Sequence, residues 1–185
     1  MKIQLKYKID DELIKIMHDL YEPFLPDTFK TGHILYHTIL DNRKPIGYVN
    51  ATKTMYLHFA LFPEYQRKNV FSIVMHEKLP TNIQRYLRMQ ETIHYTVHIA
   101  NYPFLKLLKK LNGGVSGYRD HMVLGYFEYV GPKETFHPKK EDSERLDMVI
   151  KKSKPLYEKW LIKKFKPQYE RMRSKIEEYQ KSFVK

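Results

Sequence analysis

Nine histidines and no cysteines limit the chemistry that this chain could carry. Two histidine pairs have a four-residue spacing, His33 with His37 and His94 with His98. Both pairs lie in segments expected to be strands, where residues four apart share a face but are about 13 Å apart. One ion cannot bridge that distance, and no His-Glu-x-x-His pattern occurs. We therefore expect no metal site. Ser72 also lacks the context of a nucleophile elbow.

The second informative feature is charge. The formal net charge is +12, from 33 Lys and Arg against 21 Asp and Glu. Residues 138–185 are about a quarter of the chain and carry +7 of that excess. Such a balance indicates an anionic partner, which could be nucleic acid, a membrane surface, a phosphorylated cofactor or an acidic protein.

Composition bounds the fold class. The chain has 185 residues, 42% of them hydrophobic, which suffices for one core or for a domain with an appendage. No run of eighteen apolar residues predicts a transmembrane segment, and the N-terminus has no pattern of an export signal. The lack of cysteine fits a protein that works inside a cell, so we expect a cytoplasmic location.

Hydrophobic periodicity predicts alternating strands and helices up to about residue 130. Asp41 to Pro45 has the composition of a hairpin connection, and Pro80 should kink or divide a helix. The strands are expected at 2–9, 33–40, 46–51, 55–62, 92–99, 115–118 and 122–130, and the helices at 10–20, 70–88 and 101–111. This order predicts an α/β fold with a mixed central sheet and helices on both faces.

The composition changes after Gly131-Pro132, which predicts a domain at 1–131, a linker at 132–141 and a basic helical tail at 142–185. The tail should form two helices, 142–160 and 168–183, broken near Lys166-Pro167. Lysines from Lys151 to Lys166 lie among aromatic and aliphatic residues. Residues 139–185 could therefore bind nucleic acid, a membrane surface or a protein assembly. An ordinary amphipathic helix with solvated lysines explains the pattern as well.

Two local patterns lie within residues 1–130. The first is Leu61-Phe62-Pro63-Glu64-Tyr65-Gln66-Arg67-Lys68-Asn69-Val70-Phe71, and the second is Val97-His98-Ile99-Ala100-Asn101 with Leu107 to Gly114. Together with the element order, they resemble the GNAT superfamily of acyl-coenzyme A-dependent N-acetyltransferases. The first pattern is similar to the family's strand, Gln/Arg-x-x-Gly-x-Gly/Ala turn and helix. Gly117-Tyr118-Arg119-Asp120 is similar to the branch that acetylates protein N-termini.

The resemblance implies a GNAT-like domain that binds acetyl-CoA. In the family, backbone N–H groups of the turn and of the helix start hold the pyrophosphate, as helix N-termini generally can. The residues that would bind the cofactor by this resemblance are Leu61, Phe62, Gln66, Arg67, Lys68, Asn69, Val70, Phe71 and Asn101.

Three positions depart from the family pattern. Asn69 replaces the first glycine, an exchange that is tolerated because asparagine visits positive φ more readily than most residues. Phe71 replaces the second small residue, so its ring either blocks the site or turns into the core. Leu108 takes the place where many members carry a tyrosine that protonates the departing thiolate.

An active enzyme of this family needs a base for the attacking amine. His58 and Glu64 are the nearest candidates, with the alternatives that His58 is a core or surface residue and Glu64 a solvated turn residue. Tyr118 or Tyr102 could replace the missing acid. The expected function is acetyl-CoA-dependent N-acetylation of a protein or peptide amine.

Two other functions stay open. The chain could be a catalytically inactive GNAT-fold structural or interaction protein, anchored through its basic tail. It could also be a GNAT-like enzyme that modifies a nucleic acid. A small, basic chain with a degenerate motif would also suit a phage or mobile-element protein, associated with the virion.

Overall fold

The structure is a computed structural model that describes residues 1–22, 24, 33–52, 57–66, 68–89, 92–128 and 137–183. The chain divides into two compact units, the first formed by Met1–Gln84 with Lys166–Lys185 and the second by Arg85–Phe165. Arg67, the first half of the predicted linker at 132–141 and the ends of the strands predicted at 55–62 and 122–130 lie outside the described residues. The composition change at residue 131 is not where the two units divide.

The first unit contains a four-stranded antiparallel sheet in the order β1-β2-β3-β4. The strands are β1 (Ile3–Tyr7), β2 (His33–Asp41), β3 (Lys44–Thr52) and β4 (Leu57–Leu61). The predicted hairpin between β2 and β3 is confirmed, with Asn42 and Arg43 at φ 50° and 69°. Two consecutive positive φ angles are typical of the tight turn that matches the twist of paired strands.

The helices predicted at 10–20 and 70–88 are found within one residue of these bounds, and the second prediction extends past the end of the first unit at residue 84. Helix α1 (Asp11–Tyr21) is capped by Asp10, whose carboxylate accepts from the backbone N–H groups of Glu12 and Leu13. Helix α2 (Val70–Ile73) continues as the π-helical turn η2 (Val74–Lys78). Pro80 separates this segment from α3 (Thr81–Met89), so the predicted division is confirmed.

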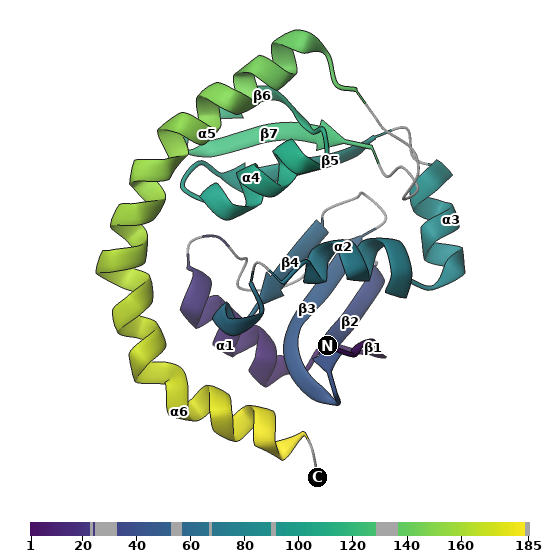
Figure 1. Ribbon diagram of the computed structural model, residues 1–185, viewed down its shortest axis with the longest axis vertical. Coiled ribbons are helices and arrows are strands. Elements are labelled where there is room, and N and C mark those ends of the chain that lie inside the picture. The colour runs from purple at the N-terminus through teal and green to yellow at the C-terminus, as the bar shows by residue number, and fades with distance from the viewer. Residues whose placement is uncertain are drawn as a thin grey trace. The chain divides into compact units, whose positions relative to one another are not determined.

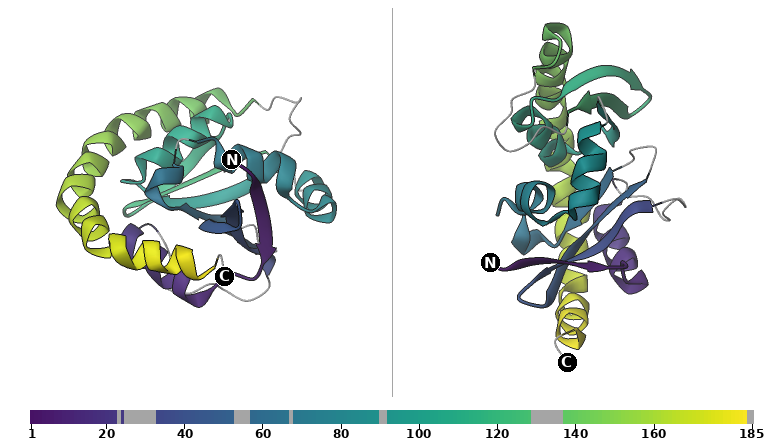
Figure 2. Two further views of the ribbon diagram at one scale, coloured as in Figure 1. Left: turned by 60° about the horizontal axis from the view of Figure 1, so that its bottom comes forward. Right: turned by 90° about the vertical axis from the view of Figure 1, so that its right-hand side faces the viewer.

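The core of the first unit lies on both faces of β3. Tyr48 and Val49 point to opposite faces and are both buried. Figure 2 shows α1 and α2 on opposite sides of the sheet. Helix α6 (Lys166–Ser182) joins the unit through Gln180, whose side-chain amide donates to the carbonyl of Pro45 at 2.9 Å.

The second unit contains a three-stranded antiparallel sheet in the order β5-β7-β6 (Figure 1). Its strands are β5 (Ile93–His98), β6 (Gly114–Arg119) and β7 (Met122–Phe127), and its helices are α4 (Tyr102–Lys110) and α5 (Lys140–Trp160). The carboxylate of Asp142 on α5 is buried. It accepts hydrogen bonds from the Tyr126 hydroxyl at 2.7 Å and from the Arg145 guanidinium at 3.0 Å. The bond to Tyr126 attaches α5 to β7.

The predicted break at Lys166-Pro167 is wrong. The helical backbone runs from Lys140 to Ser182, with the π-helical segment η3 (Leu161–Phe165) between α5 and α6. Widened turns of this kind accommodate irregularities in the hydrogen-bond ladder, such as the one that the missing N–H of Pro167 imposes. Of the helices described, none has the length and apolar character needed to cross a membrane.

The α/β class is therefore observed, with two antiparallel sheets and helices packed against them. Every strand pair within either sheet is antiparallel. A single mixed sheet would also need a parallel pair, and the described residues contain none between named strands.

Two glycines of the second sheet allow a matched test of its packing. A Cβ at Gly125 would lie 2.3 Å from the backbone oxygen of Gly114 and 2.3 Å from the hydroxyl of Tyr95, whereas a Cβ at Gly117 would meet nothing within 4 Å. We expect Gly125→Ala to lower the free energy of unfolding by about 2–3 kcal/mol through steric overlap. Gly117→Ala should change it by less than about 0.5 kcal/mol. Urea unfolding followed by circular dichroism measures both, and equal effects would contradict the strand packing described.

Candidate functional site

The turn between β4 and α2 gathers most of the predicted cofactor-binding residues. Leu61 ends the strand, and the short 3₁₀ helix η1 (Pro63–Tyr65) follows Phe62. Hydrogen bonds from the N–H of Tyr65 to the carbonyl of Phe62 and from Gln66 to Pro63 close this turn at 3.0 and 3.2 Å. The chain then reaches the start of α2 at Val70. The sequence pattern strand, turn, helix is therefore present as expected.

Side chains from α1 and α6 hold this turn. The hydroxyl of Tyr21 donates to the carbonyl of Leu61 at 2.6 Å and accepts from the side-chain amide of Gln66 at 2.7 Å. The hydroxyl of Tyr169 donates to the Glu64 carboxylate at 2.7 Å. Burial, followed by this hydrogen bond, raises the pKa of Tyr169 to about 12. Gln66 and Glu64 are thus both engaged in fixing the backbone of the turn.

Asn69 shapes the start of the helix. It has φ 58° and ψ 18°, the left-handed conformation that asparagine tolerates better than most residues, and its side chain makes no capping hydrogen bond. The N–H of Ile73 donates back to the carbonyl of Asn69 at 3.1 Å. The three preceding N–H groups, of residues 70–72, have no acceptor inside the helix. Together with the helix dipole they favour an anion at this end.

Phe71 turns into the core. Its side chain is only 7% exposed, and its ring packs edge-on against Phe59 of β4 with 4.9 Å between centroids. The sequence left two alternatives for Phe71, a ring that blocks the site or a ring that turns into the core. The structure has the ring in the core. Lys68 is exposed beside the helix start, and its ammonium lies 4.9 Å from the ring centroid of Tyr65. A positive charge therefore lies over the Tyr65 ring in the turn that precedes α2.

His58 belongs to a polar row that crosses the first sheet. It pairs with Asn50 of β3, which in turn pairs with Tyr36 of β2, and directly opposite residues share a face. Asn50 is 0% exposed, and neither polar atom of its side chain has a hydrogen-bond partner among the described residues. Burial, with Asp11 as a smaller cause, raises the pKa of Tyr36. Sequence reasoning missed Asn50, although an asparagine within an otherwise apolar strand was a usable signal.

The remaining predicted residues belong to the second unit. Tyr118 on β6 is 51% exposed and pairs with Val123. Asn101 caps α4, its side-chain oxygen accepting from the N–H of Phe104 at 3.3 Å. Leu108 is fully buried on α4. The structure therefore gathers His58, Glu64 and the β4–α2 turn in one unit and places Tyr118 and Asn101 in the other.

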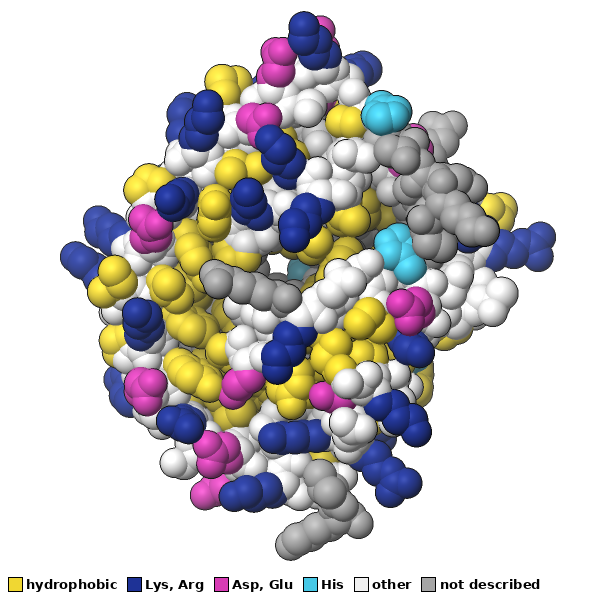
Figure 3. All heavy atoms as spheres, viewed as in Figure 1, with side chains coloured by type: hydrophobic (Ala, Val, Ile, Leu, Met, Phe, Trp, Pro, Cys, Tyr) yellow, Lys and Arg dark blue, Asp and Glu magenta, His cyan; other side chains and the backbone are white. Residues whose placement is uncertain are grey.

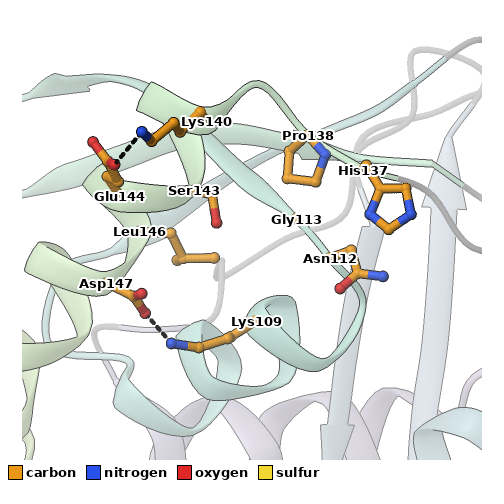
Figure 4. A pocket seen from close by; sticks show the side chains of 10 residues that line it. All are labelled: Lys109, Asn112, Gly113, His137, Pro138, Lys140, Ser143, Glu144, Leu146 and Asp147. Carbon is orange, nitrogen blue, oxygen red and sulfur yellow. Dashed lines mark hydrogen bonds and ion pairs between the residues drawn. The ribbon is translucent and has the colours of Figure 1, made fainter.

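The second unit also contains a cavity of about 350 Å³ between the end of α4 and the start of α5 (Figure 4). Lys109 forms an ion pair with Asp147 across it, and Lys140 lies 3.9 Å from Glu144. Both lysines are thus already neutralised by neighbouring carboxylates. Sequence reasoning did not find this cavity, because its walls come from segments about 30 residues apart in the chain.

The chain matches no protein-family model, and no curated protein matches it in sequence. Its function has to be argued from its own residues. Among the residues that the structure describes, no group of three or more His, Cys, Asp or Glu could hold a metal ion.

The conformation of Asn69 gives a prediction about stability. Alanine at φ 58° should lower the free energy of unfolding by about 1 kcal/mol, because its Cβ crowds the following carbonyl in the left-handed region. Glycine has no such penalty, so Asn69→Gly should leave stability within about 0.5 kcal/mol of the wild type. Urea unfolding of both variants tests this, and an Asn69→Ala protein as stable as Asn69→Gly would contradict the left-handed turn.

Two half-buried histidines give a prediction about pH. Burial lowers the pKa of His37 below its ordinary value of 6.5, and burial followed by the neighbouring His121 lowers that of His98. The Nδ1 atom of each ring accepts a backbone N–H, at 3.2 Å from Tyr36 and at 3.1 Å from Ala100, which a protonated ring could not do.

The unfolded chain therefore binds more protons than the folded one between the lowered pKa values and about 6.5. The free energy of unfolding should fall as pH drops below about 6.5 and be fully regained above it. His37→Asn with His98→Asn keeps an acceptor and removes the titration, so the fall should become shallower. His137→Asn, at an exposed histidine, is the control, and an unchanged profile in the double variant would contradict the assignment.

Proposed function

We propose that the chain is an N-acetyltransferase that uses acetyl-CoA and acts on a protein or peptide amine. One observation carries the proposal. The β4–α2 turn ends in a left-handed Asn69 at the start of the helix, and the bulky Phe71 packs against Phe59 in the core. The observed element order, strand, helix, three strands, helices, strand, helix and two strands, supports the same family.

The residues of the turn fit the pyrophosphate of acetyl-CoA. The N–H groups of residues 70–72 lack acceptors within the helix, and the ammonium of Lys68 adds a positive charge to the turn that precedes them. The hydrogen bonds of Tyr21 and Tyr169 hold the preceding residues in place, so the turn needs little reorganisation on binding. Acetyl-CoA, when bound, supplies an acetyl group activated as a thioester.

His58 is the better of the two candidate bases. It lies on β4 in the polar row with Asn50, and an imidazole takes up a proton readily near neutral pH. The Glu64 carboxylate already accepts a hydrogen bond from Tyr169 and helps to shape the turn. In this proposal the bond from the amine nitrogen to the acetyl carbon replaces the bond to sulfur, and His58 takes the proton of the amine and returns it to the departing thiolate. Binding of both substrates supplies the proximity for direct attack.

A second candidate function is a GNAT-fold interaction protein without catalysis. The buried Leu108 favours it, because this position offers no hydroxyl to protonate a thiolate. Acetyl-CoA binding separates the two candidates, since the interaction protein does not require it.

The first experiment is isothermal titration calorimetry with acetyl-CoA. We expect binding by the wild type, weakened about tenfold or more by Lys68→Glu, because a negative charge then faces the pyrophosphate. The matched control is Lys78→Glu at the other end of the same helical segment, where a charge of equal size lies far from the turn. Absence of acetyl-CoA binding by the wild type would contradict the proposal.

Catalysis is tested separately with His58→Ala. This variant should bind acetyl-CoA as the wild type does and lose transfer to a peptide N-terminus, measured by release of free thiol. Equal transfer rates would show that His58 is not the base. Binding with no transfer in the wild type towards any peptide would favour the interaction protein.

A further inference from the structure

The outward face of α5 and η3 carries exposed aliphatic residues. Met148 and Ile162 are 53% and 63% exposed, and Pro155 lies midway between them at a spacing of seven residues. A seven-residue spacing keeps all three on one side of a helix. Leu156, beside Pro155, is 44% exposed. Met148, Pro155 and Ile162 form an apolar row along the solvent side, and Leu156 lies at the edge of this row.

Exposed lysines flank this row. Five of them have no acidic side chain within ion-pair distance in the part of the chain that the structure describes, and they are Lys151, Lys152, Lys159, Lys163 and Lys164. Lys154 is the exception, since it lies 3.9 Å from Glu158. Figure 3 shows blue side chains along the edge where α5 runs in Figure 1. We call the apolar row and these five lysines the outer stripe.

The orientation of this stripe is fixed by the opposite side of the helix. Leu146, Val149 and Ser153 are buried, and the Asp142 carboxylate is tied to Tyr126 of β7. The helix therefore cannot roll to hide its aliphatic residues without exposing its packed side.

The aromatic side chains of this segment pack against other aromatic rings. The Tyr157 ring lies 6.1 Å from that of Tyr102 on α4 and 5.6 Å from that of Trp160. The Trp160 ring in turn lies 5.1 Å from that of Phe165. Rings packed against one another in this way are not presented for stacking on bases, which single-stranded nucleic acids would require.

We propose that the outer stripe binds the surface of a membrane that contains anionic lipids. Lysines on a helix can place their ammonium groups at lipid phosphates while their alkyl stems and the aliphatic row enter the interface. The phosphate backbone of duplex DNA would bind the lysines but would bury none of Met148, Leu156 and Ile162. The aliphatic row therefore favours a lipid surface over duplex DNA. The stripe spans residues 148–164, about 24 Å of helix, long enough to lie along the surface. This inference does not depend on acetyl transfer.

The test uses the full chain and sedimentation with vesicles of phosphatidylglycerol and phosphatidylcholine in equal parts, and with pure phosphatidylcholine. We expect binding to the anionic vesicles alone, weakening as salt is added. Lys152→Gln, Lys159→Gln and Lys163→Gln together should weaken it about 100-fold, since each lysine near an anionic surface contributes about fivefold. Met148→Ser with Ile162→Ser should weaken it about tenfold.

Matched controls lie elsewhere on the surface. Lys78→Gln, Lys175→Gln and Lys181→Gln remove the same charge from exposed lysines outside the stripe, and Met89→Ser removes an aliphatic side chain that is 73% exposed. Both controls should bind as the wild type does, and circular dichroism checks that every variant is folded.

Two outcomes would overturn the proposal. One is absence of binding to anionic vesicles at low salt. The other is unchanged vesicle binding in the Met148→Ser, Ile162→Ser variant. Were the triple lysine variant also to lose duplex DNA binding in that case, the stripe would be a nucleic-acid surface and not a lipid surface.

Discussion

The hydrogen bond from Tyr21 to the carbonyl of Leu61 is the constraint on which the candidate site depends. It joins the last residue of α1 to the last residue of β4, and so fixes where the strand ends and the turn begins. The same hydroxyl accepts from Gln66, which extends the restraint across the 3₁₀ turn to the residues before α2. A helix start binds an anion well only if its N–H groups stay in place, so this restraint prepares the turn for binding.

A buried carboxylate has the corresponding role in the second unit. Asp142 would cost several kcal/mol if buried alone, and the bonds from Tyr126 and Arg145 offset that cost. Because the pairing satisfies Asp142 only in one orientation of α5, it also decides which side chains face the solvent. The outer stripe is therefore a consequence of how the helix is anchored. A chain with this anchor exposes Met148 and Ile162 whether or not a partner is present.

The sequence predicted those features that local residues decide. The hairpin at Asn42 and Arg43, the cap at Asp10 and the division at Pro80 each follow from the φ preferences or hydrogen-bonding groups of one or two residues. It did not predict the contact of Tyr169 with Glu64, whose partners are 105 residues apart. The helical continuity past Pro167 was also missed, because a π-helical segment has no known signal of composition and depends on packing around it.

The direction of Phe71 shows why a departure from a motif has to be judged in three dimensions. Phe71 precedes Val74 and Met75 by three and four residues, so the three share the buried face of one helical segment. A small residue is needed at this position only if its side chain points towards the ligand. Here the position of Phe71 on the helix directs its ring towards Phe59. The N–H groups of the first turn point along the helix axis instead. The two departures, Asn69 and Phe71, are therefore compatible with an anion at the helix start, and the loss of a hydroxyl at Leu108 is the departure that weighs against catalysis.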